Sequence, residues 1–494
     1  MKRYLRLVSF MLIIFFTIIL VKCAVNPVTG KKEIMLISQS EEINMGKEID
    51  RAIRIEYGLY YDPAMSAYVE RVGRQIVPYT HRPNLEYHFA ILDTPVENAF
   101  AAPGGYIYIT RGLLALMNSE AELATVLAHE LGHVSARHSA RHMTRAILFE
   151  LGIVLAATLS KDFRKIAPIS LIATQLLFLK FSRDDEYQAD SLGIDYSFKT
   201  GYDSGKMVDF FNSLEKATRV YGSSKLPNFL STHPVTAKRI NRIKELWQGS
   251  GYALQAGDPP LLVERNGYLK GINGLVYGVN PRQGFVENGV FYHPDMAFAF
   301  QVPRGWTVTN TPLQVTLSPT DGKAVIIMQA EKTTDSLDSY AAKMTKDMTA
   351  TTVFDRGFRY INGFNAYRSV FSLVTATEES GETEKKEELA VNIACIRKEA
   401  YVFSFFSAAA SPDYSQYESL INRTINSFSQ LKNTAYLSRK PQRVYTKQVT
   451  QPQTLQDFLQ VLRVPSQHWQ HIALLNSLEM NQSLSRGQLI KVIL

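Results

Sequence analysis

The stretch LAHELGHVSARHSARH, residues 127–142, places four histidines and one glutamate close together. We expect it to lie on one helix that runs through about residue 142. His129 and His133 are four residues apart, so on a helix both imidazoles project from one face and can share one cation. Glu130 is displaced by one position, where it can reach a water on that cation.

The second pair of histidines is expected to point elsewhere. On one continuous helix His138 lies five positions beyond His133, which rotates it by roughly 140° about the helix axis. His142 follows four positions after His138. We therefore interpret His138 and His142 as surface or packing residues.

The residues around this HExxH pattern favour a metal site over a solvated polar stripe. The pattern is short enough to occur by chance, but its flanks are apolar, at Leu123, Val126, Leu127, Leu131 and Val134. The helix is therefore expected to be largely buried. Burying two histidines and a carboxylate without a partner is costly, and a bound cation removes that cost.

A third ligand is expected from the segment FSRDDEYQADSLG, residues 181–193. Catalytic zinc usually has three protein ligands and one open position. Glu186 can bind the metal, and Asp190, four residues later, can accept the other ring N–H of a ligand histidine. Asp184 and Asp185 are rival carboxylates that more naturally face solvent near Arg183.

Other short patterns predict the elements around these motifs. Ser119 with Glu122, and Ser38 with Glu41, predict capping boxes at helix starts. The Asp62-Pro63 pair also predicts a helix start. YHFAILD (87–93) and YIYIT (106–110) have the composition of strands.

Five segments in the same order resemble the M48 family of metallopeptidases. They are CAVNPVTGKKEIMLIS (23–38), NAFAAPGGYIYITRGLL (98–114), HELGHVSARH (129–138), SRDDEYQAD (182–190) and STHPVTAKRI (231–240). The resemblance implies a mainly α, zincin-type protease domain with a small β-sheet. It also implies one zinc ion per chain, held by His129, His133 and Glu186, with Glu130 as the catalytic base.

The same resemblance implies roles for further residues. Asp190 matches the acidic residue of the family's ExxxD segment. Residues 98–101 (Asn98, Ala99, Phe100 and Ala101) resemble the edge strand that binds substrate backbone. His233 matches a histidine that closes the zinc site as a latch. It could instead stabilise the oxyanion, with Arg239 nearby.

The N-terminus indicates export and membrane attachment. A basic start, MKRYLR, is followed by the apolar run LVSFMLIIFFTIILV, which predicts a signal peptide over residues 1–22. Cys23 stands where bacterial lipoproteins carry their lipid, although Lys22 departs from the small residue preferred before it. An uncleaved N-terminal anchor is the alternative. We expect a bacterial cell-envelope protein on the periplasmic side of a membrane.

Composition limits the partners. The 494 residues suit roughly two to four domains, and 46% hydrophobic with 20% charged residues is ordinary for a globular protein. The formal net charge is +8, and four of the positive charges precede Cys23. No basic stretch interleaved with aromatic residues stands out, so nucleic acid is not an expected partner.

The C-terminal half predicts two smaller domains. GVFYHPDMAFAFQVPRGWTVTN (289–310) resembles the start of PsbP/Mog1-like α+β domains, and residues 454–493 are similar to a LysM module. The predicted organisation is a signal peptide (1–22), an M48 protease domain (23–260), a linker (261–285), an α+β domain (286–432) and a LysM-like αβ module (437–494).

Three functions follow as alternatives. The first is a zinc endopeptidase that hydrolyses peptide bonds of misfolded or unassembled envelope proteins. In the second, the site is mostly latched and the chain acts as an envelope chaperone or scaffold. The third, suggested by the tail alone, is an endopeptidase for peptidoglycan crosslinks.

Overall fold

A computed structural model describes residues 23–145, 180–221, 228–249, 252, 258–346, 348, 350–377 and 385–494. The signal peptide expected at 1–22 lies outside this part of the chain. Within it, no helix is long and apolar enough to cross a membrane.

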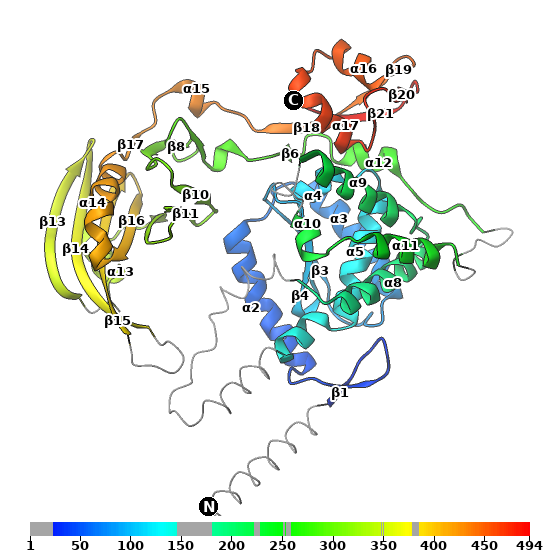
Figure 1. Cartoon of the computed structure of the whole chain (residues 1–494), viewed down its shortest axis with the longest axis horizontal. Coiled ribbons are helices and arrows are strands. Elements are labelled where there is room, and N and C mark those ends of the chain that lie inside the picture. Colours follow the sequence, from blue (N-terminus) through cyan, green and yellow to red (C-terminus); the bar gives the residue numbers. More distant parts are fainter. Residues whose placement is uncertain are drawn as a thin grey trace, which may run out of the picture. The chain divides into compact units, whose positions relative to one another are not determined.

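The chain forms two compact units (Figure 1). The first combines the residues up to Gly278 with Gln442–Leu494, and the second is Val279–Pro441. The segment predicted as a LysM-like tail therefore shares a unit with the HExxH residues.

The helix starts predicted from short patterns are present in the first unit. Helix α2 (Gln39–Tyr57) begins with a capping box between Ser38 and Glu41. Asp62 caps α3 (Pro63–Ile76) by accepting a hydrogen bond from the Met65 amide. These caps satisfy amide groups that the first helical turn leaves unpaired.

A small sheet precedes the HExxH helix. Its strands are β3 (His88–Leu92), β4 (Ala99–Ala102) and β5 (Tyr106–Thr110), in the order β3-β5-β4. Strand β5 is parallel to β3 and antiparallel to β4. The sheet is followed by the short helix α4 (Arg111–Leu116), capped by Thr110.

Helix α5 (Glu120–Ser135) carries the HExxH residues, and every one of its residues is buried. It packs against α3, β4, α8 (Arg183–Lys199) and α9 (Lys206–Tyr221) (Figure 1). Ser119 caps its start, as predicted. The predicted reciprocal bond is replaced, because the Glu122 carboxylate accepts the amide of Asn118.

The expectation of one helix through residue 142 is wrong. Helix α5 ends at Ser135, and Arg137 adopts a left-handed conformation with φ of 57°. A second helical segment covers 138–145. The break is held in place because Arg137 donates to the Glu42 carboxylate at 2.9 Å and to the Ile37 carbonyl at 2.8 Å.

The other elements of the first unit are short. Some precede the second unit in the sequence, and the others follow it. They are β1 (Cys23–Val25), β2 (Lys32–Ile34), α10 (Asn228–Thr232), α11 (Ala237–Trp247), α12 (Arg265–Gly271), β6 (Val276–Tyr277), β18 (Gln442–Gln448), β19 (Gln453–Thr454), α16 (Leu455–Val461), α17 (Trp469–Leu475), β20 (Ser483–Leu484) and β21 (Leu489–Ile493). Strand β18 lies between β6 and β21, so the tail continues a sheet begun before residue 279.

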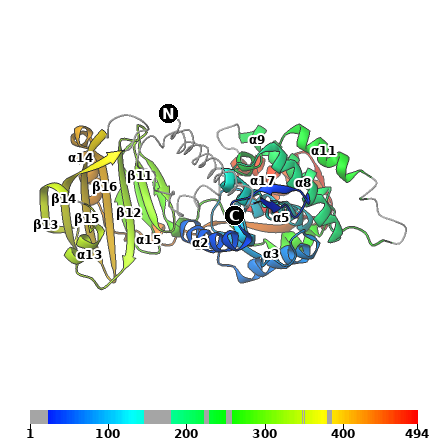
Figure 2. The same ribbon diagram turned by 90° about the horizontal axis from the view of Figure 1, so that it is seen from below.

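The second unit is α+β. One sheet has the order β10-β11-β12-β16-β15-β14-β13, and most of its strands can be followed in Figure 2. A smaller sheet has the order β17-β9-β8-β7. The strands are β7 (Phe285–Glu287), β8 (Val290–His293), β9 (Phe298–Gln301), β10 (Thr307–Asn310), β11 (Gln314–Ser318), β12 (Ala324–Lys332), β13 (Ala350–Ile361), β14 (Phe364–Thr377), β15 (Lys385–Lys398), β16 (Tyr401–Ala410) and β17 (Ser429–Gln430). The helices are α13 (Leu337–Met344), α14 (Ser411–Asn426) and α15 (Thr434–Leu437).

Two helices cover opposite faces of the larger sheet. Ile393 and Cys395 of β15 pack in one hydrophobic cluster with Leu337 of α13. Ala394, which alternates with them, packs in another cluster with Ile421 of α14. Successive side chains of a strand point to opposite faces, so the two helices sandwich the sheet.

Candidate metal centre

Four side chains from three parts of the first unit converge on one point. His129 and His133 come from α5, Glu186 from α8, and His233 from the loop after α10. Their ligand atoms all lie within 4.8 Å of one another, and all four residues are buried. The structure thus brings together the three ligands implied by the resemblance and adds His233 to them.

Helix geometry and two glycines bring the ligands together. Four residues are close to one helical turn, and the Nε2 atoms of His129 and His133 lie 3.1 Å apart. Helices α5 and α8 approach closely at Gly132 and Gly193. A Cβ at Gly132 would lie 3.2 Å from the Ala189 carbonyl oxygen, and one at Gly193 would lie 3.2 Å from the His129 Cα. Larger residues there would push Glu186 away from the histidines.

Glu130 lies beside this group, with His233 and the backbone of Ala101 next to its carboxylate. It is fully buried, and neither carboxylate oxygen accepts a hydrogen bond from the described residues. The Nε2 atom of His233 lies 3.6 Å from Oε1 of Glu130. Burial raises the pKa of Glu130.

The donor set fits zinc. Three imidazoles and one carboxylate are ligands that zinc prefers. Burial and the neighbouring imidazoles hold the pKa of His133 well below its usual value, so this ring stays neutral, the form that binds a metal. The Nε2 atom of His233 is also buried without a hydrogen-bond partner among the described residues. A cation at the centre would satisfy these atoms.

Asp190 and Arg239 contact the proposed ligand residues and hold them in position. Asp190 Oδ1 lies 3.1 Å from Nδ1 of His129, the position expected for a carboxylate that orients a ligand histidine. Arg239 donates to both oxygens of Asp190, at 2.6 and 2.8 Å, and lies 2.8 Å from Oε2 of Glu186. Burial raises the pKa of Asp190, but Arg239 outweighs it, and the pKa is lowered.

His138 is placed differently from the expectation. It is fully buried, and its Nδ1 lies 2.8 Å from Nδ1 of His133. The rotation calculated for a continuous helix does not apply because the chain turns at Arg137. His142 is partly exposed, with Nε2 3.9 Å from Asp185, and it remains a peripheral residue. Asp185 is itself buried, so the solvent-facing position expected for it is wrong.

His233 lies in the loop after α10, and its ring contacts both Phe229 and Glu186. Its ring stacks on Phe229 with centroids 4.8 Å apart, and its Nδ1 lies 2.9 Å from Oε1 of Glu186. Burial lowers the pKa of His233. The carboxylates of Glu186 and Glu130 raise this pKa by more, so the net shift is upward. The loop is therefore in contact with the metal ligands.

The predicted substrate strand is β4, which lies at an edge of its sheet among the described strands. Asn98, just before it, is fixed by Thr110 and by Thr232, whose hydroxyl donates to its side chain at 3.1 Å. The Phe229 amide donates to the Glu97 carbonyl at 2.8 Å. In this conformation residues 98–101 are all buried, and helix α10 is bonded to the start of the strand.

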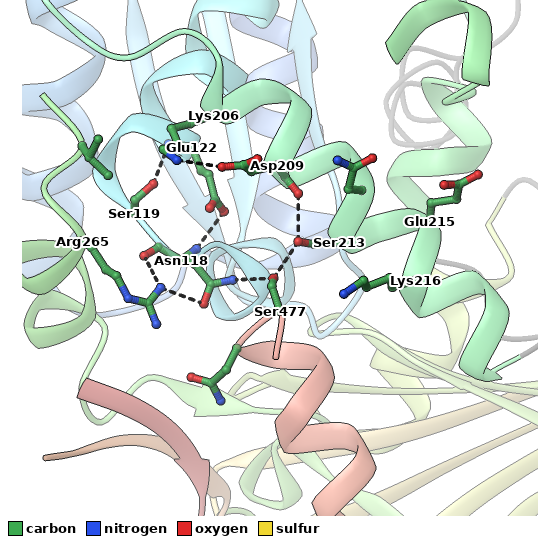
Figure 3. Close-up of a pocket in the computed structure, with 13 residues that line it drawn as sticks. Asn118, Ser119, Glu122, Lys206, Asp209, Ser213, Glu215, Lys216, Arg265 and Ser477 are labelled. Carbon is green, nitrogen blue, oxygen red and sulfur yellow. Dashed lines mark hydrogen bonds and ion pairs between the residues drawn. The ribbon is translucent and has the colours of Figure 1, made fainter. Parts of the chain in front are cut away.

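A separate cavity of about 510 Å³ lies between α5, α9 and the C-terminal tail. Figure 3 shows Asn118 at its centre. The Asn118 side chain donates to Ser477 at 3.2 Å, and Ser477 in turn bonds Ser213 at 2.6 Å. None of the four clustered metal ligands lines this cavity. The contacts join the tail to the start of the HExxH helix.

Together, the buried helix, its two histidines and a glutamate from a second helix form a group with the donor set of a zinc metallopeptidase site. The profile of peptidase family M48 matches residues 63–247. These residues are thus similar to peptidase family M48, as their motifs led us to expect.

Curated relatives share this region. The chain is 30% identical over 213 residues to a β-barrel assembly-enhancing protease of Yersinia pestis, which covers 42% of this chain and 43% of the relative. It is 31% identical over 224 residues to the mitochondrial metalloendopeptidase OMA1 of Schizosaccharomyces pombe, covering 44% of this chain and 65% of that protein. The chain thus spans less than half of the first relative.

Solved structures resemble the chain only weakly. Cyanobacterial PsbP from Synechocystis has a TM-score of 0.21 at 12% identity and covers 28% of this chain and 91% of that protein. The Ran-binding protein Mog1p from Saccharomyces cerevisiae has a TM-score of 0.21 at 11% identity, covering 31% of this chain and 99% of that protein.

Proposed function

We propose that the chain is a membrane-tethered zinc endopeptidase that hydrolyses peptide bonds of misfolded or unassembled cell-envelope proteins. One observation carries this proposal. The carboxylate of Glu130 is buried and unbonded next to the convergent group of His129, His133 and Glu186. A buried base beside a metal site is an arrangement that supports metal-assisted hydrolysis of an amide.

In this proposal His129, His133 and Glu186 hold the zinc ion. The ion supplies Lewis-acid polarisation of a carbonyl and acidification of water. Asp190 keeps His129 oriented, and Arg239 keeps both Asp190 and Glu186 in place. All three nitrogens of the Arg239 guanidinium are engaged by Asp190, Glu186 and the Pro234 carbonyl, which favours a supporting role over an oxyanion role.

Glu130 performs the proton transfers. Its carboxylate accepts a proton as water attacks the peptide carbonyl, and then returns that proton to the leaving amine. Residues 98–101, at the edge of the sheet, bind the substrate as an added extended strand through main-chain hydrogen bonds. The edge position of β4 next to α5 supports a zincin-type arrangement.

His233 is proposed to act as a latch. Its ring lies among the three ligands, and the helix α10 that precedes its loop is bonded to Glu97 and Asn98 beside the proposed substrate strand. Substrate therefore requires this loop to move. Withdrawal of His233 would free both a ligand position and the edge strand in one motion.

The tether and the tail complete the proposal. Cys23 carries a lipid, or residues 1–22 remain as an anchor, and the protein acts at the periplasmic side of a membrane. The tail folds as β18, α16, α17 and β21 in sequence, which supports a LysM-like module. The name of the Yersinia relative, a β-barrel assembly-enhancing protease, supports envelope proteins as substrates.

Two other functions remain as candidates. The buried position of His233 favours a mostly latched protein that acts as an envelope chaperone or scaffold. The LysM-like order of the tail elements favours cleavage of peptidoglycan crosslinks.

Zinc content and substrate choice test the proposal. The purified chain should bind one zinc ion and digest unfolded casein, and a chelator should abolish digestion until zinc is restored. Glu186→Ala should lower the zinc content. A chain that binds zinc but digests only purified peptidoglycan would favour the third function. Zinc binding without hydrolysis of either, even after His233→Ala, would favour the scaffold.

A further inference from the structure

We infer that His138 is a positioning residue for the zinc site, and that it sets which nitrogen of His133 carries the proton. The inference rests on the proposed function, because it concerns how one zinc ligand is kept ready. It starts from an unusual contact. Nδ1 of His138 and Nδ1 of His133 lie 2.8 Å apart, and both residues are buried.

Only one proton fits between these two nitrogens. The Nε2 atom of His133 faces the other ligands, 3.1 Å from His129 Nε2 and 3.6 Å from Glu186 Oε1. A neutral imidazole has one N–H and one lone pair. If His133 carried its proton on Nε2, the N–H would point at the metal position and block it. His133 must therefore carry its proton on Nδ1 and donate it to His138.

The hydrogen bond between His138 and Gln188 selects the arrangement in which His133 donates to His138. A neutral His138 that accepts at Nδ1 carries its own proton on Nε2. Nε2 of His138 lies 3.0 Å from the side-chain oxygen of Gln188, which accepts it. The row from Gln188 through His138 to His133 has one donor and one acceptor at each contact. It leaves the lone pair of His133 Nε2 directed toward the zinc position.

His129 has a different outer partner for the same task. Its Nδ1 lies 3.1 Å from the Asp190 carboxylate, which Arg239 anchors. Each ligand histidine of α5 thus has its own buried outer partner. The histidine row for His133 exists only because α5 ends at Ser135 and Arg137 turns the chain back.

The test is the zinc dissociation constant of the full-length chain, measured by competition with a chelating dye. His138→Leu removes the acceptor but keeps an apolar side chain of similar reach, and it should weaken zinc binding roughly 10- to 100-fold. His138→Asn places an amide oxygen near the position of Nδ1 and should restore most of the affinity. The control is His142→Leu, since His142 lies in the same helical segment without touching a ligand, and its affinity should equal the parent's.

A structural role alone would give a different pattern. It would lower the melting temperature of the zinc-free protein in His138→Leu and His138→Asn alike, without separating their zinc affinities. Should His138→Leu not fold, His138→Ala against His138→Asn decides, because only the asparagine supplies an acceptor for the Nδ1–H of His133. Equal zinc affinity within that pair, or a parent-like His138→Leu, would overturn the inference. A parent chain that binds no zinc would instead refute the proposed function.

Discussion

At the scale of single residues, His233 is the side chain whose removal should change activity most informatively. One of its ring nitrogens lies within 4.8 Å of a ligand atom of each of the other three residues, and its ring stacks on Phe229 of α10. If it is a latch, His233→Ala should raise casein digestion and self-cleavage. Zinc should stay bound because His129, His133 and Glu186 remain.

The opposite result has a clear meaning. If His233 instead stabilises the transition state, turnover should fall roughly 10²–10³-fold, as for other oxyanion donors. The control is His468→Ala, since His468 lies in the tail outside the metal cluster. Unchanged turnover and unchanged self-cleavage in His233→Ala would reject both roles.

The metal ligands could be predicted from the sequence, but one of their partners could not. His129, His133 and Glu186 follow from helical spacing and motif order. His138 required knowledge of the turn at Arg137, which depends on a contact with Glu42, 95 residues earlier. A local pattern cannot reveal a helix end that is fixed by such a distant residue.

At the scale of elements, the turn that ends α5 should depend on Glu42 of α2. Its carboxylate lies 3.0 Å from Arg82 and 2.9 Å from Arg137, and all three side chains are buried. Glu42→Gln leaves two buried guanidinium groups without a counter-charge. The free energy of unfolding in urea should fall by about 3–5 kcal/mol.

A second glutamate on the same helix provides the control. Glu48 is exposed, so Glu48→Gln should change the unfolding free energy little. Equal, small changes in the two variants would show that the network around Glu42 does not stabilise the turn.

The tail should be fixed to the peptidase part by Lys491. This residue of β21 is fully buried, and its ammonium donates to the carbonyls of Ala115, Leu116 and Met117 at 2.8, 3.2 and 2.8 Å. These carbonyls end α4, directly before the HExxH helix. Lys491→Met fills the space but leaves buried acceptors unpaired.

Lys491→Met should lower the free energy of unfolding by about 1–3 kcal/mol. Lys447→Met is the matched control on the paired strand β18, because Lys447 is only partly buried. If Lys491→Met unfolds at the same urea concentration as Lys447→Met, the tail is held by its apolar contacts alone.

Some elements could be predicted and others could not. The strands β3 and β5 and the start of α3 follow from local composition and caps. Strand β13 (Ala350–Ile361) was not predicted. Phe354, Phe358 and Tyr360 are exposed in it, so its apolar side chains do not mark a buried face in the way that a sequence pattern assumes.

At the scale of the whole molecule, Cys23 is the residue that tests the proposed membrane tether. Cells fed a labelled fatty acid should label the protein if Cys23 is lipidated, and Cys23→Ser should abolish the label. Cys395→Ser is the control, because Cys395 is buried in β15 and should not affect labelling. Label that survives Cys23→Ser, or its absence from the parent, would favour an uncleaved anchor.

The central claim is that Glu130 is the base of a zinc peptidase, and Glu130→Gln tests it most directly. The ligands stay in place in this variant, so it should bind one zinc ion per chain like the parent. Casein hydrolysis should fall roughly 10²–10⁴-fold because the proton acceptor is lost. Glu86→Gln, at an exposed glutamate, should behave like the parent. A zinc-loaded Glu130→Gln chain that digests casein at the parent rate would contradict the account.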